Sequence, residues 1–228
     1  MGPFADFKWH ALFSDLPLFF RGLGYTFMIS VLALALALVL GIIFGLLSET
    51  QFKPARVISR IYVEFFQNTP LLIQVFFLYN GLPLMGIMMS VTSIGIIGVG
   101  LYTGAYITEV VRAGIGSVSR GQLEAGLSQG FTYTQVMLNI ILPQAIRVML
   151  PPLTNQAVNL IKNTSVVAII SGADIMFTAN SWSSNNLYYG PAFVAAGLLY
   201  FILCFPLAKL ATRLENKMTS EQEGGVHV

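Results

Sequence analysis

Residues 30–47 read SVLALALALVLGIIFGLL, and after Ser30 no charged or strongly polar side chain interrupts them. An α-helix needs about 20 predominantly apolar residues to cross the hydrocarbon core of a bilayer. The apolar pattern extends back to about residue 22, so residues 22–47 are long enough to cross. We therefore expect a transmembrane helix here, and this expectation decides the class of the fold.

The composition of the whole chain agrees with that class. Of its 228 residues, 55% are hydrophobic and 10% are charged, and the mean hydropathy is +0.73. Soluble domains carry roughly 25% charged residues. A soluble domain is therefore excluded. The single cysteine, Cys204, lies in an apolar stretch and permits no internal disulfide.

Further apolar stretches have the length of a membrane span. Together they predict an all-α polytopic membrane protein with transmembrane helices at about residues 22–47, 59–80, 90–111, 146–170 and 190–210. Residues 1–21 alternate aromatic and polar side chains, which is typical of an interfacial segment outside the membrane. Residues 22–217 would form a single transmembrane domain, and the polar residues 218–228 a disordered tail.

Basic side chains gather on one side of these five spans. They follow span one, lie between spans three and four, and follow span five: Lys53, Arg56, Arg60, Arg112, Arg120, Arg147, Lys209, Arg213 and Lys217. The connections on the other side, at about 81–89 and 171–189, contain no lysine or arginine. Since basic loops stay in the cytoplasm, we expect the N-terminus outside, the C-terminus inside and residues 113–145 in the cytoplasm.

Span two carries four polar side chains close together: Glu64, Gln67, Asn68 and Thr69. Polar groups inside a membrane mark either helix packing or a pathway. Arg60 and Glu64 are four residues apart, so an ion pair within the helix is an equally good interpretation of Glu64. Pro70 removes a backbone donor and frees a carbonyl one turn earlier, which could bind a solute if it faced a cavity.

Span four has a polar stripe at helical spacing. Asn155, Asn159 and Lys162 or Asn163 recur every three or four residues, and Ser165 lies nearby. A lysine at this depth must face a cavity, a carboxylate or backbone carbonyls. Each asparagine alone is explained as well by hydrogen bonding between helices. For the stripe as a whole we expect a solvated pathway. The glycine-rich third span, by contrast, is typical of close helix packing.

The sequence also excludes several kinds of chemistry. It has no G-x-x-x-x-G-K-[ST] motif, so the chain cannot hydrolyse ATP alone. Its two histidines, His10 and His227, lie outside the spans at opposite ends. We therefore expect no catalytic residue, no metal site, no cofactor on this chain and no nucleic-acid partner.

One polar stretch between spans differs from a simple loop. Residues 124–143 read EAGLSQGFTYTQVMLNIILP, with helix formers at both ends and a break at Gly130 and the residues after it. Pro143 is expected to break the second helical part again. The pattern predicts a helix–turn–helix module at the membrane surface, which needs a partner to dock against.

This stretch resembles the EAA loop of ATP-binding-cassette (ABC) importer permeases. That pattern is Glu-Ala-Ala, three residues, Gly, nine residues, Ile, one residue, Leu-Pro. The chain matches its spacing throughout, with Gly126 in place of the second alanine: Glu124, Ala125, Gly126, Gly130, Ile140, Leu142 and Pro143. The resemblance implies that these residues couple the chain to an ATPase. Gly126 is expected to loosen the first helix by about 0.5–1 kcal/mol.

The resemblance extends over most of the chain and narrows to the polar amino-acid uptake permeases of the histidine/glutamine type. Residues 62–83, 105–126 and 160–171 are similar to that group's second span, its approach to the coupling loop and its fourth-span signature. The resemblance implies a non-catalytic permease of the bacterial plasma membrane. Its partners would be two ABC ATPase subunits that bind ATP and Mg, a second permease, and an extracytoplasmic amino-acid-binding protein.

The polar residues of spans two and four would then line the substrate pathway: Glu64, Gln67, Asn68, Thr69, Asn155, Asn159, Lys162 and Ser165. The alternative is a gradient-driven secondary transporter or channel-like subunit, with Glu64 and Lys162 as gating charges. Neither the amino acid carried nor the identity of the second permease follows from the sequence.

Overall fold

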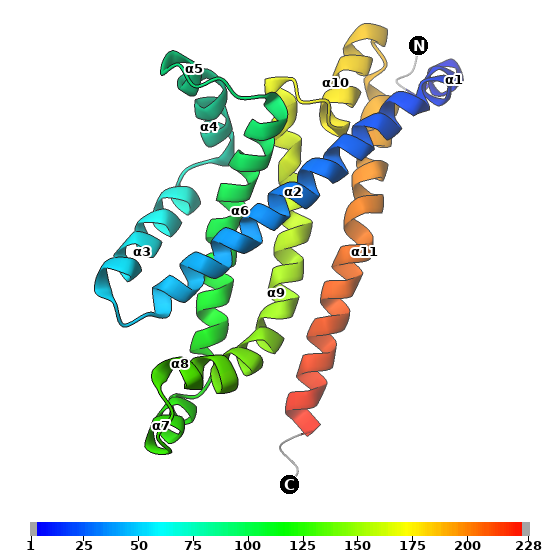
Figure 1. Ribbon diagram of the computed structural model, residues 1–228. Helices are drawn as coiled ribbons and strands as arrows, with labels where there is room; N and C mark the ends of the chain where they lie inside the picture. Colours follow the sequence, from blue (N-terminus) through cyan, green and yellow to red (C-terminus); the bar gives the residue numbers. More distant parts are fainter. Residues whose placement is uncertain (1–3, 225–228) are drawn as a thin grey trace.

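The computed structural model describes residues 4–224, which contain helices and no strand (Figure 1). The elements are α1 (Asp6–Ser14), α2 (Leu16–Glu49), α3 (Lys53–Asn68), α4 (Leu71–Phe76), the π-helical turn η1 (Phe77–Gly81), α5 (Leu82–Leu84), α6 (Val91–Gly116), α7 (Arg120–Ser128), α8 (Tyr133–Val136), the π-helical turn η2 (Met137–Ile141), α9 (Leu142–Asn163), the 3₁₀-helix η3 (Thr164–Ile170), α10 (Ile175–Asn186) and α11 (Tyr189–Gly224).

Four helical runs in the described part are long and apolar enough to cross a membrane: Leu16–Glu49, Val91–Gly116, Tyr133–Ile170 and Tyr189–Met218. A fifth is counted if Lys53–Asn68 and Leu71–Leu84 form one span. The prediction of an all-helical, multi-span membrane protein is therefore confirmed. The expected tail is helical as far as Gly224, and residues 225–228 lie outside the described part.

The second span, which we expected over about 59–80 with an interruption at Thr69 and Pro70, is broken at that point. Its two halves meet at Thr69 and Pro70 with a bend of 100°. The carbonyls of Phe66 and Thr69, left without helical partners, accept hydrogen bonds from the buried Gln74 side chain at 3.1 and 2.9 Å. The carbonyl that Pro70 frees, which could bind a solute only if it faced a cavity, is thus satisfied within the chain.

Small residues join α2 to α6. Ala33, Ala37, Gly41 and Gly45 recur every four residues along α2 and are all buried. A Cβ atom at Gly45 would stand 2.5 Å from the Val111 side chain of α6, and one at Gly41 would overlap Ile107. This close approach replaces side-chain interdigitation by backbone contact, as is common between membrane helices.

The glycines of α6 pack in the same way, so the packing interpretation of the third span is confirmed. A Cβ at Gly100 would lie 2.8 Å from Leu36 of α2, and one at Gly104 would lie 2.6 Å from the Tyr62 hydroxyl of α3. That hydroxyl donates to the Leu101 carbonyl at 2.7 Å. Helix α6 therefore forms the centre of the bundle, with α2, α3 and α9 packed on it (Figure 1).

Helix α2 begins at Leu16, so the expected boundary between residues 21 and 22 falls inside a helix. The short α1 precedes it at the end of the bundle that also holds α10 (Figure 1). There Asp15 accepts a hydrogen bond from the Trp182 indole at 2.8 Å. Asp174 caps α10 through the amides of Met176 and Phe177, and burial raises the pKa of its carboxyl to about 6.

Pro143 does not break the helix at its position, contrary to expectation. A proline ring clashes with the carbonyl four residues earlier in a regular helix. Here the preceding turn is π-helical, because the Leu142 amide donates to the Met137 carbonyl five residues back. The same arrangement precedes Pro83, where the Leu82 amide donates to Phe77. Each Leu-Pro pair therefore follows one wide turn, and the helical run continues.

Candidate functional site

The stretch between α6 and α9, residues 117–141, forms a helix–turn–helix elbow at one end of the bundle (Figure 1). We call it the elbow. Its first arm is α7, whose N-terminus is capped by the Ser119 hydroxyl. Its second arm is α8 with η2, which continues into α9. The predicted helix–turn–helix module is therefore present.

Gly130 makes the turn between the arms. Its φ is +87°, a left-handed conformation that side chains with a Cβ rarely adopt. Its amide donates to Leu127 at 3.0 Å, and the Phe131 amide donates to Gly126 at 3.2 Å. This pair of bonds is a Schellman motif, which closes the C-terminus of α7.

The second arm starts with a capping box that sequence reasoning missed. The Gln135 amide donates to the Thr132 hydroxyl, and the Thr132 amide donates to the Gln135 side chain at 2.8 Å. The signal was visible in the sequence as T-x-x-Q. Both ends of the turn are thus held by local hydrogen bonds, so the elbow is a defined structure and not an open loop.

The residues matched to the EAA pattern divide by exposure. Glu124, Ala125, Gly130 and Pro143 are exposed, whereas Gly126 is buried and Ile140 and Leu142 are half-buried. A Cβ at Gly126 would stand 2.7 Å from Val136 and 3.4 Å from Ile140 on the other arm. Glycine here lets the two arms touch. The expected loosening of α7 stays a prediction, and the structure adds that glycine permits the close contact of the arms.

We predict that Gly126→Ala, which would restore the family's alanine, destabilises the elbow by about 1 kcal/mol. The added methyl overpacks against the stiff, buried Val136, and this cost exceeds the gain in helix propensity. Hydrogen–deuterium exchange of the α7 amides measures the change in local opening.

Two variants control this prediction. Gly126→Ala combined with Val136→Ala should recover part of the loss, whereas Gly121→Ala, in an open position of the same helix, should protect α7. Two results would contradict the contact: exchange of the α7 amides that is slower in Gly126→Ala than in the wild type, and effects of Gly126→Ala and Val136→Ala that simply add in the double variant.

The elbow also reaches α2. The Tyr133 hydroxyl donates to the Glu49 carbonyl, the last residue of α2, at 3.1 Å. Exposed apolar side chains stand at the elbow's tip, with Leu127 and Phe131 each more than 40% exposed. Sequence reasoning named neither. The tip thus offers an apolar surface beside Glu124, which suits contact with another protein.

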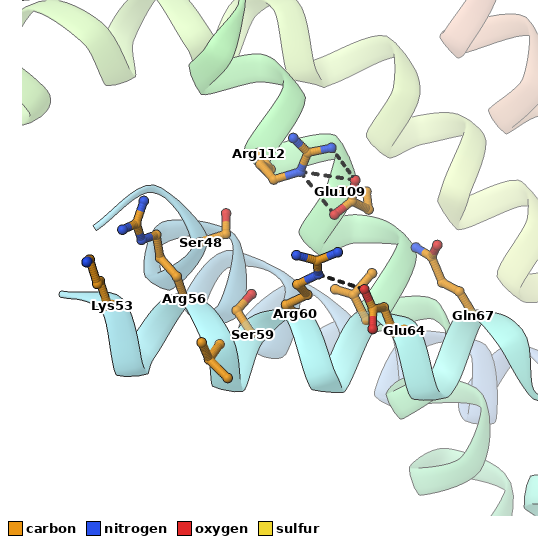
Figure 2. Close-up of a pocket in the computed structure, with 11 residues that line it drawn as sticks. Ser48, Lys53, Arg56, Ser59, Arg60, Glu64, Gln67, Glu109 and Arg112 are labelled. Atoms are coloured by element: carbon orange, nitrogen blue, oxygen red, sulfur yellow. Dashed lines mark hydrogen bonds and ion pairs between the residues drawn. The ribbon is translucent and has the colours of Figure 1, made fainter. Parts of the chain in front are cut away.

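A first pocket, of about 700 Å³, lies between α3, α6 and the end of α2 (Figure 2). Its charged side chains are Lys53, Arg56, Arg60, Glu64, Glu109 and Arg112. Glu64 pairs with Arg60 at 2.7 Å, and Glu109 pairs with Arg112 at 2.6 Å. The predicted pair within α3 is therefore confirmed. The side chains of Arg60 and Glu64 are both largely exposed, so this pair contributes little to stability.

A second pocket, of about 410 Å³, lies between α6 and α9. It is lined by Tyr102, Thr103, Tyr106, Gln156, Asn159, Lys162 and Asn163. The hydroxyls of Tyr102 and Tyr106 are 3.1 Å apart, and the buried Thr103 hydroxyl has no partner in the described part of the chain. Lys162 is the one charged residue among those lining this pocket.

The eight residues expected to line one pathway are thus divided between the first pocket, the second pocket and positions outside both. Glu64 and Gln67 line the first pocket, and Asn159 and Lys162 the second. Asn68 donates to the Glu64 carbonyl, Thr69 lies at the break, and Ser165 donates to the Lys162 carbonyl. Asn155 is exposed on α9 but lines neither pocket. Within one chain, α6 stands between the two sets.

Sequence reasoning missed the α6 contribution to both pockets. Tyr102 and Tyr106 are four residues apart in the glycine-rich span, and that spacing could have signalled one polar face. No group of three or more histidine, cysteine, aspartate or glutamate side chains that could hold a metal occurs between residues 4 and 224.

Comparisons with known proteins agree with this architecture. A family model described as "Binding-protein-dependent transport system inner membrane component" matches residues 37–220. The chain is 42% identical to the probable glutamine ABC transporter permease protein GlnM of Bacillus subtilis (strain 168), over 91% of this chain and 96% of that protein.

Two further relatives extend the comparison. The probable glutamine ABC transporter permease protein GlnP of the same organism is 33% identical, over 85% of this chain and 92% of that protein. Among solved structures, a crystal structure of an amino acid ABC transporter with histidines superimposes with a TM-score of 0.86 and 30% identity, covering 92% of this chain and 98% of that one.

Proposed function

The chain belongs to the family of binding-protein-dependent transport system inner membrane components, and from this we propose that it is the permease subunit of an ATP-driven importer of polar amino acids. The observation that carries the proposal is the elbow, which keeps the EAA spacing and folds as a closed helix–turn–helix at the ends of two spans. Relatives named as glutamine permeases support the class of substrate.

We propose five spans with the N-terminus outside and the elbow in the cytoplasm of a bacterium's plasma membrane. Helices α1 and α10 lie at one end of the bundle, and the elbow, the α2–α3 turn and the end of α11 at the other (Figure 1). The basic residues between and after the spans gather at the elbow's end, which the positive-inside rule assigns to the cytoplasm. Residues 22–217 would be the permease domain.

In this proposal the elbow docks on a separate ABC ATPase, which binds ATP and Mg, and the permease itself performs no catalysis. Closure of two ATPase subunits would move the elbow as a unit, since both ends of its turn are held by hydrogen bonds. The motion would reach α9 directly and α2 through Tyr133. A second permease and an extracytoplasmic amino-acid-binding protein complete the importer.

The second pocket is the better candidate for contact with the amino acid. Asn159 and Lys162 are exposed in the single chain although they lie within a span, and Lys162 cannot face hydrocarbon at low cost. The Lys162 ammonium would pair with the substrate carboxylate, and the tyrosines and amides would bind its polar side chain. Glu64 and Gln67 would line the pathway nearer the cytoplasm, at the end of the first pocket away from Lys53 and Arg56 (Figure 2).

Reconstituted uptake tests the proposal against a gradient-driven transporter. The permease is placed in proteoliposomes with its partner ATPase and binding protein, and labelled glutamine is supplied outside. We expect uptake that requires enclosed ATP and persists when ionophores collapse the proton and sodium gradients. Uptake that follows a gradient with ATP absent would overturn the proposal.

We predict that Lys162→Met raises the KM of reconstituted uptake roughly 10- to 100-fold, because a charge-assisted hydrogen bond to the substrate is lost. Size-exclusion chromatography should show the same assembled complex as before. Lys209→Met, which removes a lysine at the far end of α11, is the control and should leave KM unchanged. An unaltered KM in Lys162→Met would return Lys162 to a structural role.

A further inference from the structure

Helix α3 has two contrasting faces. Ile58, Ile61 and Phe65 lie on one face, and each side chain is more than half exposed. The other face turns Lys53, Arg56 and Arg60 toward the first pocket (Figure 2). A helix with an apolar face and a basic face is typical of the boundary between acyl chains and lipid headgroups.

The first pocket has more positive than negative charge. Lys53, Arg56, Arg60 and Arg112 supply four cations, against the carboxylates of Glu64 and Glu109. Those carboxylates form ion pairs with Arg60 and Arg112, respectively. Between residues 4 and 224, neither Lys53 nor Arg56 forms an ion pair, so two cations at one end of the pocket remain without a counter-charge.

In the proposed orientation, these two cations lie at the level of the membrane surface. Lys53 is the first residue of α3, and Ser48, which also lines the pocket, lies in the last turn of α2. Arg56 is one turn further, at roughly 5 Å along the helix axis. The interfacial region of a bilayer is about 5–7 Å deep on each side, so both side chains reach headgroup phosphates.

We infer that Lys53 and Arg56 hold the phosphate of an anionic phospholipid from the cytoplasmic leaflet in the mouth of the first pocket. The acyl chains would lie along Ile58, Ile61 and Phe65, which continue the same helix toward the membrane centre. Basic pockets between membrane helices on the cytoplasmic side are suited to such headgroups. A soluble anion would leave the apolar face unused. The inference rests on the proposed orientation of the chain.

Native mass spectrometry of the assembled transporter tests this site. The complex is titrated with phosphatidylglycerol and with phosphatidylcholine of the same acyl chains, and inorganic phosphate is titrated separately. We expect tighter binding of phosphatidylglycerol. In Lys53→Gln/Arg56→Gln its affinity should fall on the order of 30-fold, while phosphatidylcholine binding is unchanged.

Lys209→Gln/Arg213→Gln is the matched control. It removes the same charge at the same end of the bundle, but from α11 and outside the pocket. It should keep the phosphatidylglycerol affinity. An equal loss in the control would reduce the effect to general surface charge and overturn the site.

Two other results would also overturn it. Inorganic phosphate bound as tightly as phosphatidylglycerol would indicate a soluble anion, and absence of lipid in the wild type would indicate that a second permease covers the pocket. ATP-driven uptake is measured in parallel in phosphatidylcholine vesicles. Normal ATP-driven uptake without a preference for phosphatidylglycerol would overturn only the lipid site. Loss of uptake with that preference intact would overturn only the proposed import function.

Discussion

Gly41→Leu is expected to destabilise the folded protein strongly. A side chain at this position would enter the space of Ile107 and approach the Gly104 carbonyl of α6, where the two helices are in close contact. Ile107 is fully buried and β-branched, so it has no other rotamer space to enter. Overpacking of this kind costs roughly 3 kcal/mol. For a chain of this size that lowers the thermal midpoint by on the order of 10 °C.

Fluorescence-detected size-exclusion chromatography with a thermal ramp measures this effect in detergent. Gly24→Leu on the same helix is the matched control, because Gly24 is exposed and a Cβ there meets nothing within 4 Å. It should fold as well as the wild type or better, since leucine favours a helix over glycine. Equal behaviour of the two variants would show that α2 does not depend on close contact with α6.

Gly130→Val is expected to abolish ATP-coupled uptake while the spans remain folded. At φ +87° a β-branched side chain is strongly disfavoured, so the Schellman bonds to Leu127 and Gly126 would open. The two arms would lose their relative orientation, and with it the surface that we propose contacts the ATPase. We expect at least a tenfold fall in uptake and in the ATPase retained on an affinity-tagged permease.

Gly130→Asn separates the conformation of Gly130 from its small size. Asparagine adopts the left-handed conformation more readily than other side chains, and a Cβ at Gly130 meets nothing within 4 Å in the chain. This variant should keep most of the uptake. If asparagine and valine reduce uptake equally, the space around Gly130 in the complex matters, and the turn itself does not.

The sequence predicts the long helices well because hydrophobic length in a membrane protein leaves few alternatives. Backbone groups in hydrocarbon must be paired within one helix, so an apolar run such as residues 22–47 has one solution. The same physics explains the errors. Pro143 suggests a break, yet the wide turn before it lets the helical run continue. At Pro70 the carbonyls freed by the break find Gln74, four residues further on.

The elbow was predictable to the level of its motif. Gly130 and the T-x-x-Q cap act through hydrogen bonds between residues close in sequence, so their structural role can be predicted from the local sequence. The contact that Gly126 makes was not foreseen because its partner, Val136, lies on the other arm. Helix propensity considers α7 alone, where glycine only weakens the helix, and does not include a contact across the turn.

The polar residues of the spans show most clearly what sequence spacing cannot predict. Spacing along one helix correctly paired Arg60 with Glu64, because residues four apart share a face. Spacing cannot say which helix stands between Glu64 and Lys162. That helix is α6, and it also brings Tyr102 and Tyr106 to Lys162 and Glu109 and Arg112 to Glu64.

Hydrophobic length, charge placement and local hydrogen bonds act over a few turns of chain. The amino-acid sequence is therefore enough to predict a membrane protein of long helices with a polar elbow of defined spacing. The angle of the bend at Pro70, the fit of Gly41 and Gly126, and the division of the polar residues into two pockets became known only from the folded chain. They depend on which helix surfaces meet, and contacts between different helices are not encoded in the pattern of any one helix.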